Sequence, residues 1–515
     1  MNGMNRSVKR VALAALVMFL VLMVNVNYLQ AVEAPSLASK PENSRATYDQ
    51  NKVQRGNIVT ADGVTIATSK QAGGSTSLYP WQRVYPAGPT YAPVTGYKTV
   101  YASAAQAPNY ATGVELAENG LLTGTGSQLA FRNFVDTLTN KPQKGATVQV
   151  TINSKAQKAA YEQLQTTLQG KTINGVQQVG GVVALNPSTG AILAMASYPS
   201  YDPNQLAVLD TTKLSEVDTQ LNKQNPSPLL NNAAQTTLPP GSTFKIVTSS
   251  AWYNQDSTRN PQTKVASPQP LHLPNGNLLN NDGTPPEQCG DGSGQTAILD
   301  AFAQSCNTPF AQLGIDLGGN TINSMATAYG LNSTIDIPGV KTAKSNFTAE
   351  TDKSFTAFDA IGQHDTTVTP LQEAMFAATV ANNGVLMKPY LIQQVQASDL
   401  SVVDQTQPQK LSQPISSTIA GDEKQMMIAV VQQGNGTGNA FNANNENGLL
   451  IAGKTGTAQN GVSTQPDAVF TAFAPADNPK IAVGVMIEGG GYGAAAAAPI
   501  AVAVIKAYLQ TLGIQ

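Results

Sequence analysis

The sequence predicts an α/β fold in which an antiparallel sheet is flanked by helices and preceded by an extended, loop-rich N-terminal module. Two apolar runs, 180–185 and 191–195, are separated by a short turn sequence, which is typical of a buried hairpin. Continuously apolar strands of this kind indicate a sheet that is covered on both faces. Strand-like runs at 470–473 and 480–488 and a helical pattern at 494–512 supply further strands and a closing helix.

Length and composition limit the classes of function. The chain has 515 residues, a formal net charge of -2 and only 12% charged residues, so its charge gives no reason to expect nucleic acid as a partner. Two cysteines and two histidines leave little material for a metal site, and we expect neither a metal nor a cofactor. The length suffices for two or more domains.

The N-terminus is typical of a membrane anchor. Basic residues within 1–10 precede a run without charged residues at 11–32, which is long enough for one bilayer crossing. The basic flank predicts a cytoplasmic tail at 1–10, a single transmembrane segment at 11–32 and an extracytoplasmic remainder. A signal peptide cleaved near Val32-Glu33-Ala34 is the alternative, and it also exports the remaining chain.

The exported part divides into two domains. Residues 33–144 begin as a polar stalk, carry a hairpin signal around the Asp-Gly pair at 62–63, and are otherwise loop-like, so we interpret them as a non-catalytic pedestal domain. Residues 145–515 form the second domain, which opens with a strand at 145–152 and a helix at 154–168. Further helical patterns are expected at 301–317 and 369–382. One long loop is expected at 255–295.

A candidate nucleophile lies in the stretch Pro-Pro-Gly-Ser-Thr-Phe-Lys at 239–245. The prolines and glycine interrupt the chain, and the apolar residues that follow predict the start of a helix. Because positions i and i+3 share a helix face, the Ser242 hydroxyl and the Lys245 amine are neighbours. A neutral Lys can take the Ser proton, and the helix N-terminus favours the developing anion. A helix-capping Ser beside a solvated Lys is the alternative.

Two further motifs follow downstream. They are Ser-Cys-Asn at 305–307 and Lys-Thr-Gly-Thr at 454–457, the second of which comes directly after a strand-like run. The patterns S-x-x-K, S-x-N and K-T-G each occur once, in this order, behind an export signal. Chance is therefore a poor explanation for the set, although each motif alone could merely cap a turn or end a strand.

With these three motifs the chain resembles the penicillin-recognising serine enzymes, in which the motifs line one cleft. It is most similar to the class B penicillin-binding proteins of the short A type, over most of residues 11–515. Further segments that match the family are 55–58, 180–203, 362–363, 369–372, 434–438 and 497–499. The chain departs from the family at His364, where Gly is usual, and at 467–470, where many relatives have His-Ala-Trp-Phe.

The resemblance implies a penicillin-binding/serine β-lactamase-like transpeptidase domain that cross-links cell-wall peptidoglycan by D,D-transpeptidation. The reaction would pass through a serine acyl-enzyme on D-Ala-D-Ala stem peptides, and β-lactams would inhibit it covalently. The expected partners are peptidoglycan stem peptides, lipid-linked or in nascent strands, β-lactam antibiotics, the membrane, and proteins of cell-wall synthesis or division.

The resemblance also implies residue roles. Ser242 would attack the penultimate D-alanine carbonyl with Lys245 as the neutral general base, and Ser305 with Lys454 would relay a proton to the leaving nitrogen. The positions that would bind the substrate are Asn307, Thr455, Gly456 and Thr457. The backbone N–H groups of Ser242 and Thr457 would form the oxyanion hole.

Two physical arguments accompany these roles. A second ammonium at Lys454 would lower the pKa of Lys245 by repulsion. The missing side chain at Gly456 would let substrate lie against a strand edge.

Other functions remain open. The same acyl-enzyme could be hydrolysed, as in a D,D-carboxypeptidase or a serine β-lactamase. A non-catalytic β-lactam sensor or divisome scaffold is a second alternative. A Ser-His-Asp triad is a poorer interpretation, because His272 and His364 are the only histidines.

Cys289 and Cys306 are predicted to form a disulfide. They are the only cysteines, and both lie in the part expected outside the cytoplasm, where disulfides persist. Such a bridge would fix the loop that carries Ser305 and Asn307. Two separate buried thiols are the alternative.

Overall fold

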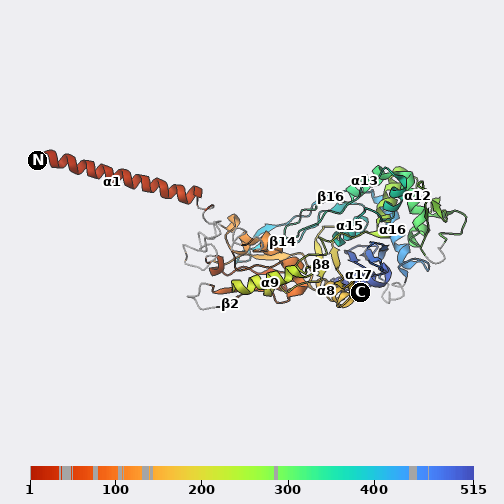
Figure 1. Ribbon diagram of the computed structural model, residues 1–515, viewed down its shortest axis with the longest axis horizontal. Helices are drawn as coiled ribbons and strands as arrows, with labels where there is room; N and C mark the ends of the chain where they lie inside the picture. The colour runs from red at the N-terminus through yellow and green to blue at the C-terminus, as the bar shows by residue number, and fades with distance from the viewer. Residues whose placement is uncertain are drawn as a thin grey trace.

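An isolated N-terminal helix precedes an elongated body in the computed structural model (Figure 1). Helix α1 (Asn2–Tyr28) projects away from the body and is followed by a short π-helical turn, η1 (Leu29–Glu33). Its segment Arg6–Tyr28 is long and apolar enough to cross a membrane and is not buried by the rest of the chain. This is consistent with the expected anchor, although the apolar span starts and ends several residues earlier than 11–32. The described residues are 2–33, 36, 48, 50–72, 79–101, 107, 110–129, 139, 143–282, 288–439, 449–461 and 463–514.

The predicted antiparallel sheet is present and has five strands in the order β17-β18-β19-β7-β8. The strands are β7 (Gly180–Leu185), β8 (Ile192–Tyr198), β17 (Ala452–Ala458), β18 (Asp467–Ala474) and β19 (Ile481–Ile487). All neighbouring pairs are antiparallel, and β7 joins β8 through the predicted hairpin. Strand β17 lies at one edge, and within the described residues it pairs only with β18.

Helices cover both faces of this sheet, as its continuously apolar strands predict. Helices α8 (Ser154–Leu168) and α17 (Gly493–Thr511) pack on one face, and α15 (Pro370–Ala381) packs on the other. Because side chains alternate along a strand, Val182 belongs to the α8/α17 core and Val183 to the core around α15. Helix α17 is also long and apolar enough to span a membrane, but it is partly buried against the sheet.

A second, six-stranded sheet joins the N-terminal module to later parts of the chain. Its order is β15-β14-β4-β1-β2-β3, so three of its strands come from beyond residue 145. The strands are β1 (Ile58–Val59), β2 (Thr65–Gln71), β3 (Trp81–Val84), β4 (Thr147–Val150), β14 (Ile392–Gln396) and β15 (Val402–Gln405). The hairpin expected around the Asp-Gly pair is confirmed by the antiparallel pairing of β1 with β2.

The N-terminal module also contains helices, so it is more regular than the loop-rich segment expected. They are α4 (Gly88–Thr95), α5 (Gly113–Ala117) and α6 (Asn119–Leu122). Glu115 of α5 is fully buried between two guanidinium groups, with its carboxylate 2.6 Å from Arg55 Nε and 2.5 Å from Arg83 Nε. Burial of a charge requires such pairing, and the cluster ties the helices to the sheet.

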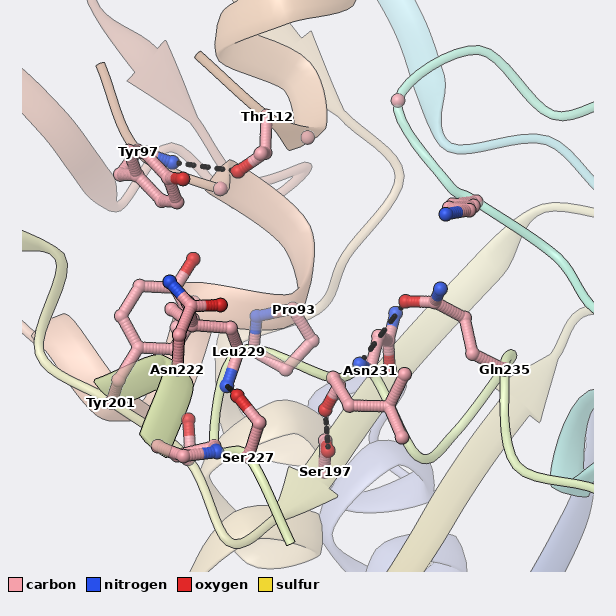
Figure 2. Close-up of a pocket in the computed structure, with 18 residues that line it drawn as sticks. Pro93, Tyr97, Thr112, Ser197, Tyr201, Asn222, Ser227, Leu229, Asn231 and Gln235 are labelled. Carbon is pink, nitrogen blue, oxygen red and sulfur yellow. Dashed lines mark hydrogen bonds between the residues drawn. The ribbon is translucent and has the colours of Figure 1, made fainter. Parts of the chain in front are cut away.

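A cavity of about 350 Å³ lies where the module meets the second domain (Figure 2). Tyr97 and Thr112 line it from the module, and Ser197, Asn231 and Gln235 line it from the opposite side. None of the residues of the three motifs at 239–245, 305–307 and 454–457 lines this cavity. The candidate site is therefore elsewhere.

Two expectations about the second domain need correction. The helix expected at 301–317 is broken into α11 (Ile298–Ala303) and α12 (Asn307–Leu317), because Ser305 has a left-handed φ of 60°. The segment 255–295, expected to be loop, contains short strands that form two-stranded sheets. These pairs are β9 (Lys264–Ala266) with β12 (Gln295–Ala297), and β10 (Leu271–His272) with β11 (Leu278–Leu279).

Other regular elements in the described residues complete the domain. The helices are α9 (Thr211–Lys223), α10 (Lys245–Gln255), α13 (Gly319–Ala328), α14 (Lys353–Asp359) and α16 (Ser417–Gln432). The strands are β5 (Thr172–Ile173), β6 (Val176–Gln177), β13 (Leu386–Met387) and β16 (Lys410–Ser412). The predicted helices at 154–168, 369–382 and 494–512 correspond to α8, α15 and α17.

Candidate active site

Ser242 lies in a tight turn at the start of a buried helix. The 3₁₀ turn Gly241–Phe244 leads directly into α10, whose first residue is Lys245. Lys245 Nζ lies 2.8 Å from Ser242 Oγ, so the predicted i, i+3 pair is in hydrogen-bonding contact. The lysine side chain is fully buried, whereas Ser242 is 9% exposed. Gly241 N donates a 2.9 Å hydrogen bond to Gly362 O, which anchors the turn to the loop after α14.

The second motif lies on the other side of Lys245. The Nζ atom of Lys245 is 2.7 Å from Ser305 O and 2.9 Å from Asn307 Oδ1. The backbone N–H groups of Asn307 and Thr308 both donate to Asn281 Oδ1, which caps the start of α12 from a distant loop. The left-handed conformation of Ser305 and this remote cap together bring the motif to Lys245.

The third motif lies on the edge strand β17. Lys454 is fully buried, and its Nζ donates to Ser305 Oγ at 2.7 Å. Thr455 Oγ1 lies 2.5 Å from Thr437 Oγ1, and Thr457 Oγ1 accepts a 3.5 Å hydrogen bond from Gly493 N. A chain of contacts therefore runs from Ser242 through Lys245 and the second motif to Lys454, and it links all three motifs.

Burial is the main cause of the unusual electrostatics of the two lysines. It lowers the pKa of Lys245 to about 7, against a small opposing effect of Asp282. Burial also lowers the pKa of Lys454 well below its usual value, and there the charge of Lys245 adds to the effect. A desolvated lysine and repulsion from Lys454 were both expected to favour the neutral amine; burial is the dominant cause, and Lys454 is not among the causes of the shift at Lys245. Phe310 lies 5.5 Å from Lys245 Nζ and contributes to this apolar surrounding.

The structure gives a different reason for the glycine in the third motif. A Cβ at Gly456 would lie 2.5 Å from Pro240 O and 3.1 Å from Thr243 Cγ2, beneath the 3₁₀ turn that carries Ser242. The missing side chain therefore allows β17 to pack against that turn. The expected contact of Gly456 with substrate can therefore involve only its backbone N–H and C=O groups.

Sequence reasoning missed two buried acids beneath the site. Glu373 of α15 accepts a 2.8 Å hydrogen bond from Thr243 Oγ1, and burial raises its pKa to about 8. Glu423 of α16 accepts a 2.6 Å hydrogen bond from Ser249 Oγ, and burial raises its pKa well above the usual value. Glu373 is therefore mostly protonated near pH 7. Glu373 is the one charged residue in the helical pattern 369–382, which was the signal available for the first of these acids.

The predicted disulfide is present. Cys289 and Cys306 are bonded across 17 positions, with their Cα atoms 6.0 Å apart. Cys306 is the residue before α12 and lies between the two polar residues of the second motif. The bridge consequently ties this loop to the segment that precedes β12.

Reduction of this disulfide should lower the free energy of unfolding by about 3 kcal/mol, because the unfolded chain regains the freedom of a closed loop. Thermal unfolding with and without reductant measures the effect, and acylation of Ser242 should become slower without being abolished. A double variant, Cys289→Ser with Cys306→Ser, is the control and should no longer respond to reductant. An unchanged melting temperature in the wild-type protein would contradict this prediction.

Comparison with known proteins gives consistent matches along most of the chain. The family described as "Penicillin binding protein transpeptidase domain" matches residues 180–506. The family described as "Penicillin binding protein A dimerisation domain" matches residues 55–148. The three motifs at 239–245, 305–307 and 454–457 all lie within the first match.

Individual relatives cover nearly the whole chain. The peptidoglycan D,D-transpeptidase PbpA of Mycolicibacterium smegmatis is 38% identical, over 98% of this chain and 99% of its own. The peptidoglycan D,D-transpeptidase PbpA of Mycobacterium tuberculosis is 36% identical, over 98% of this chain and 99% of its own. A solved structure, the imipenem acyl-enzyme complex of penicillin-binding protein A from M. tuberculosis, superposes with a TM-score of 0.80 at 35% identity, and covers 90% of this chain and all of that one. By its motifs, fold and relatives, this chain belongs to the class B penicillin-binding proteins.

Proposed function

We propose that this chain is a serine-type D,D-transpeptidase that cross-links peptidoglycan stem peptides and is acylated by β-lactams. The observation that carries the proposal is the 2.8 Å contact between Ser242 Oγ and the buried amine of Lys245. The family resemblance supports the same reaction, since relatives over the whole length carry that activity in their names and a related structure is a β-lactam acyl-enzyme.

In the acylation step, neutral Lys245 takes the proton of Ser242 Oγ as the oxygen attacks the penultimate D-alanine carbonyl. The C–N bond to the terminal D-alanine breaks, and its nitrogen receives a proton by way of Ser305 Oγ, to which Lys454 Nζ donates. In the second step, an acceptor amine attacks the ester carbonyl and the cross-linking amide forms; the acyl C–O bond breaks, and a proton from the amine returns to Ser242 Oγ.

Substrate binding is proposed along the edge of β17 that has no strand partner among the described residues. An extended peptide can add to an edge strand through backbone hydrogen bonds. The Thr455 and Thr457 hydroxyls would hold the terminal carboxylate, and Asn307 would bond the peptide backbone. The backbone N–H groups of Ser242 and Thr457 would form the oxyanion hole. The close packing of Gly241 against the Thr457 carbonyl supports this pairing, because a Cβ at Gly241 would lie 2.7 Å from that oxygen.

The membrane topology and domain division are part of the proposal. The apolar helix α1 would cross the membrane once, with residues 1–10 in the cytoplasm and the body outside it. A pedestal at 33–144 would then carry the transpeptidase domain at 145–515 away from the bilayer. Proteins of cell-wall synthesis or division are the expected partners at this location.

Product analysis separates this function from its alternatives. The full-length protein in detergent is given a D-Ala-D-Ala stem peptide with and without an amine acceptor, and the products are identified by mass spectrometry. A transpeptidase yields the cross-linked dimer with acceptor present, whereas a carboxypeptidase yields only the peptide shortened by one D-alanine. Ser242→Ala should yield neither. A protein that binds penicillin but makes neither product would contradict the proposal and favour a sensor or scaffold.

Acylation should depend on pH through Lys245. The base must be neutral, and burial sets its pKa at about 7, so the acylation rate should rise as pH increases through about 7 and level off above it. The second-order rate with a fluorescent penicillin, measured from pH 5 to 9, gives the profile. A rate that is flat across this range would contradict the assignment of Lys245 as base.

A further inference from the structure

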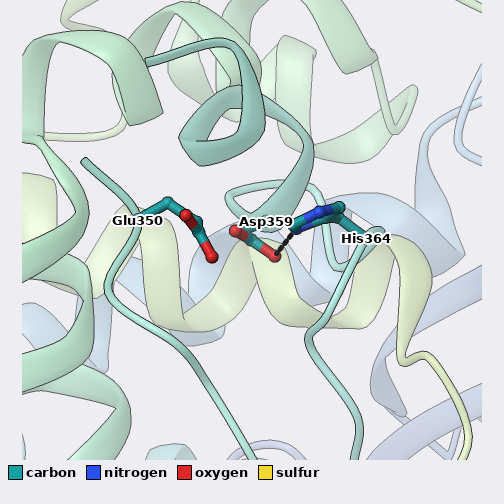
Figure 3. A group of neighbouring side chains, drawn as sticks. All are labelled: Glu350, Asp359 and His364. Carbon is teal, nitrogen blue, oxygen red and sulfur yellow. Dashed lines mark ion pairs between the residues drawn. The ribbon is translucent and has the colours of Figure 1, made fainter. Parts of the chain in front are cut away.

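Three side chains outside the active site converge at the end of α14. Glu350, Asp359 and His364 each offer one ligand atom, and these atoms lie within 4.8 Å of one another. Figure 3 shows the three side chains pointing toward a common centre from a loop, a helix end and a second loop. None of them has a role in the proposed transpeptidation.

The chemistry of the cluster points to a ligand. Asp359 is fully buried, and its Oδ2 atom has no hydrogen-bond partner, which is costly for a carboxylate unless something binds there. Its other oxygen accepts a 3.1 Å hydrogen bond from Thr366 Oγ1 and lies 3.4 Å from His364 Nδ1. That separation is longer than a charge-assisted hydrogen bond of about 2.8 Å.

We propose that Glu350, Asp359 and His364 form a binding site for a single Zn²⁺ ion. One imidazole nitrogen and two carboxylate oxygens supply three ligands of the types that zinc accepts, and they neutralise its charge. The His364 side chain is 27% exposed, so water can reach the fourth position. The sequence argued against a metal because Cys and His are scarce; here carboxylates provide two of the three ligands.

The imidazole is held in position by its surroundings. His364 stacks on Phe355, with ring centroids 4.6 Å apart and an interplanar angle of 8°. Thr366 orients the Asp359 carboxylate, as hydrogen-bonding neighbours of metal ligands commonly do. The backbone of His364 has a left-handed φ of 62°, a conformation that glycine adopts more readily.

The site is connected to the nucleophile turn through the loop between two of its ligands. Gly362 O accepts the hydrogen bond from Gly241 N, the residue before Ser242. Ala360 O accepts a 2.7 Å hydrogen bond from Thr248 Oγ1 of α10. An ion that joins Asp359 to His364 would therefore restrain the loop that supports the catalytic turn.

Zinc binding is tested on the full-length protein in detergent, after removal of metals with a chelator. Equilibrium dialysis against ZnCl₂, with metal analysis, should give one Zn²⁺ per chain, and zinc should raise the melting temperature. His364→Gly should weaken zinc binding by at least about a hundredfold. Removing a residue that only hydrogen-bonds to a metal ligand already costs up to about a hundredfold in affinity, and His364 is itself a ligand in this proposal. This variant should still fold, because glycine suits φ at this position. Glu350→Gln is a second test and should also weaken binding.

His272→Ala is the matched control, since His272 is the other histidine of the chain and is exposed on β10. It should bind zinc like the wild-type protein. Hydrogen exchange at the amide of Gly241 should become slower with zinc in the wild-type protein and not in His364→Gly. Unsaturable binding, or equal affinity in His364→Gly, would overturn the proposal and leave an ordinary His364–Asp359 ion pair. These outcomes do not depend on catalytic activity, so they are distinguishable from failure of the proposed function.

Discussion

Lys245→Arg should slow the acylation of Ser242 by penicillin by about 10²- to 10⁴-fold, the contribution that a general base makes. Arginine keeps a positive charge at this position but does not deprotonate in proteins. The wild-type amine is buried, with its pKa lowered to about 7, and lies 2.8 Å from the serine oxygen, so it can accept the proton. The variant separates a role as base from a role as fixed charge.

Stopped-flow kinetics with a fluorescent penicillin measures this rate, and thermal unfolding shows whether the variant is folded. Lys264→Arg is the matched control, because Lys264 lies exposed on the short strand β9. It should acylate like the wild-type protein. Near-normal acylation by a folded Lys245→Arg protein would refute the base assignment, whatever its melting temperature.

Gly362→Ala should reduce acylation by about a hundredfold, the effect of misplacing a reacting group by about 1 Å. Its Cβ would lie 2.1 Å from Gly241 O, so the catalytic turn or the supporting loop must move. The left-handed φ of 74° costs about 1–2 kcal/mol for any residue with a Cβ, and overpacking adds about 1–3 kcal/mol. Both the melting temperature and the acylation rate should therefore fall.

Gly276→Ala separates the two costs. Gly276 has a φ of 87°, and a Cβ there would meet nothing within 4 Å, so this variant carries the backbone strain without the clash. It should lose stability by about 1–2 kcal/mol and retain its acylation rate. If Gly362→Ala acylates as fast as this control, contact between the loop and the nucleophile turn does not position Ser242.

The sequence predicted best the elements that depend only on nearby residues, such as the hairpin of β7 and β8. The apolar runs at 180–185 and 191–195 are short and bounded by turn residues, which favours buried strands, and they pair as the hairpin β7–β8. The break at Ser305 was missed because it depends on distant contacts. Lys454 binds the Ser305 hydroxyl, and Asn281 caps the helix that follows. No local pattern encodes either contact.

The candidate site shows the same division. The motifs themselves were visible as short patterns, and the i, i+3 spacing predicted the contact between Ser242 and Lys245. Desolvation of Lys245 was expected, but its dominance over repulsion from Lys454 was not, because the depth of burial is a property of the whole fold. Glu373 escaped attention for a related reason. Its significance comes from the hydrogen bond that the Thr243 hydroxyl donates to it from the 3₁₀ turn before α10, and not from its own neighbours in sequence.

The central claim is that Ser242 is the nucleophile of an acyl-enzyme, and the most direct test is mass spectrometry of the intact protein after reaction with penicillin. The account predicts one added penicillin per chain, mapped after digestion to the peptide that contains Ser242 and absent from Ser242→Ala. An adduct on Ser305, or no adduct on the folded wild-type protein, would contradict it.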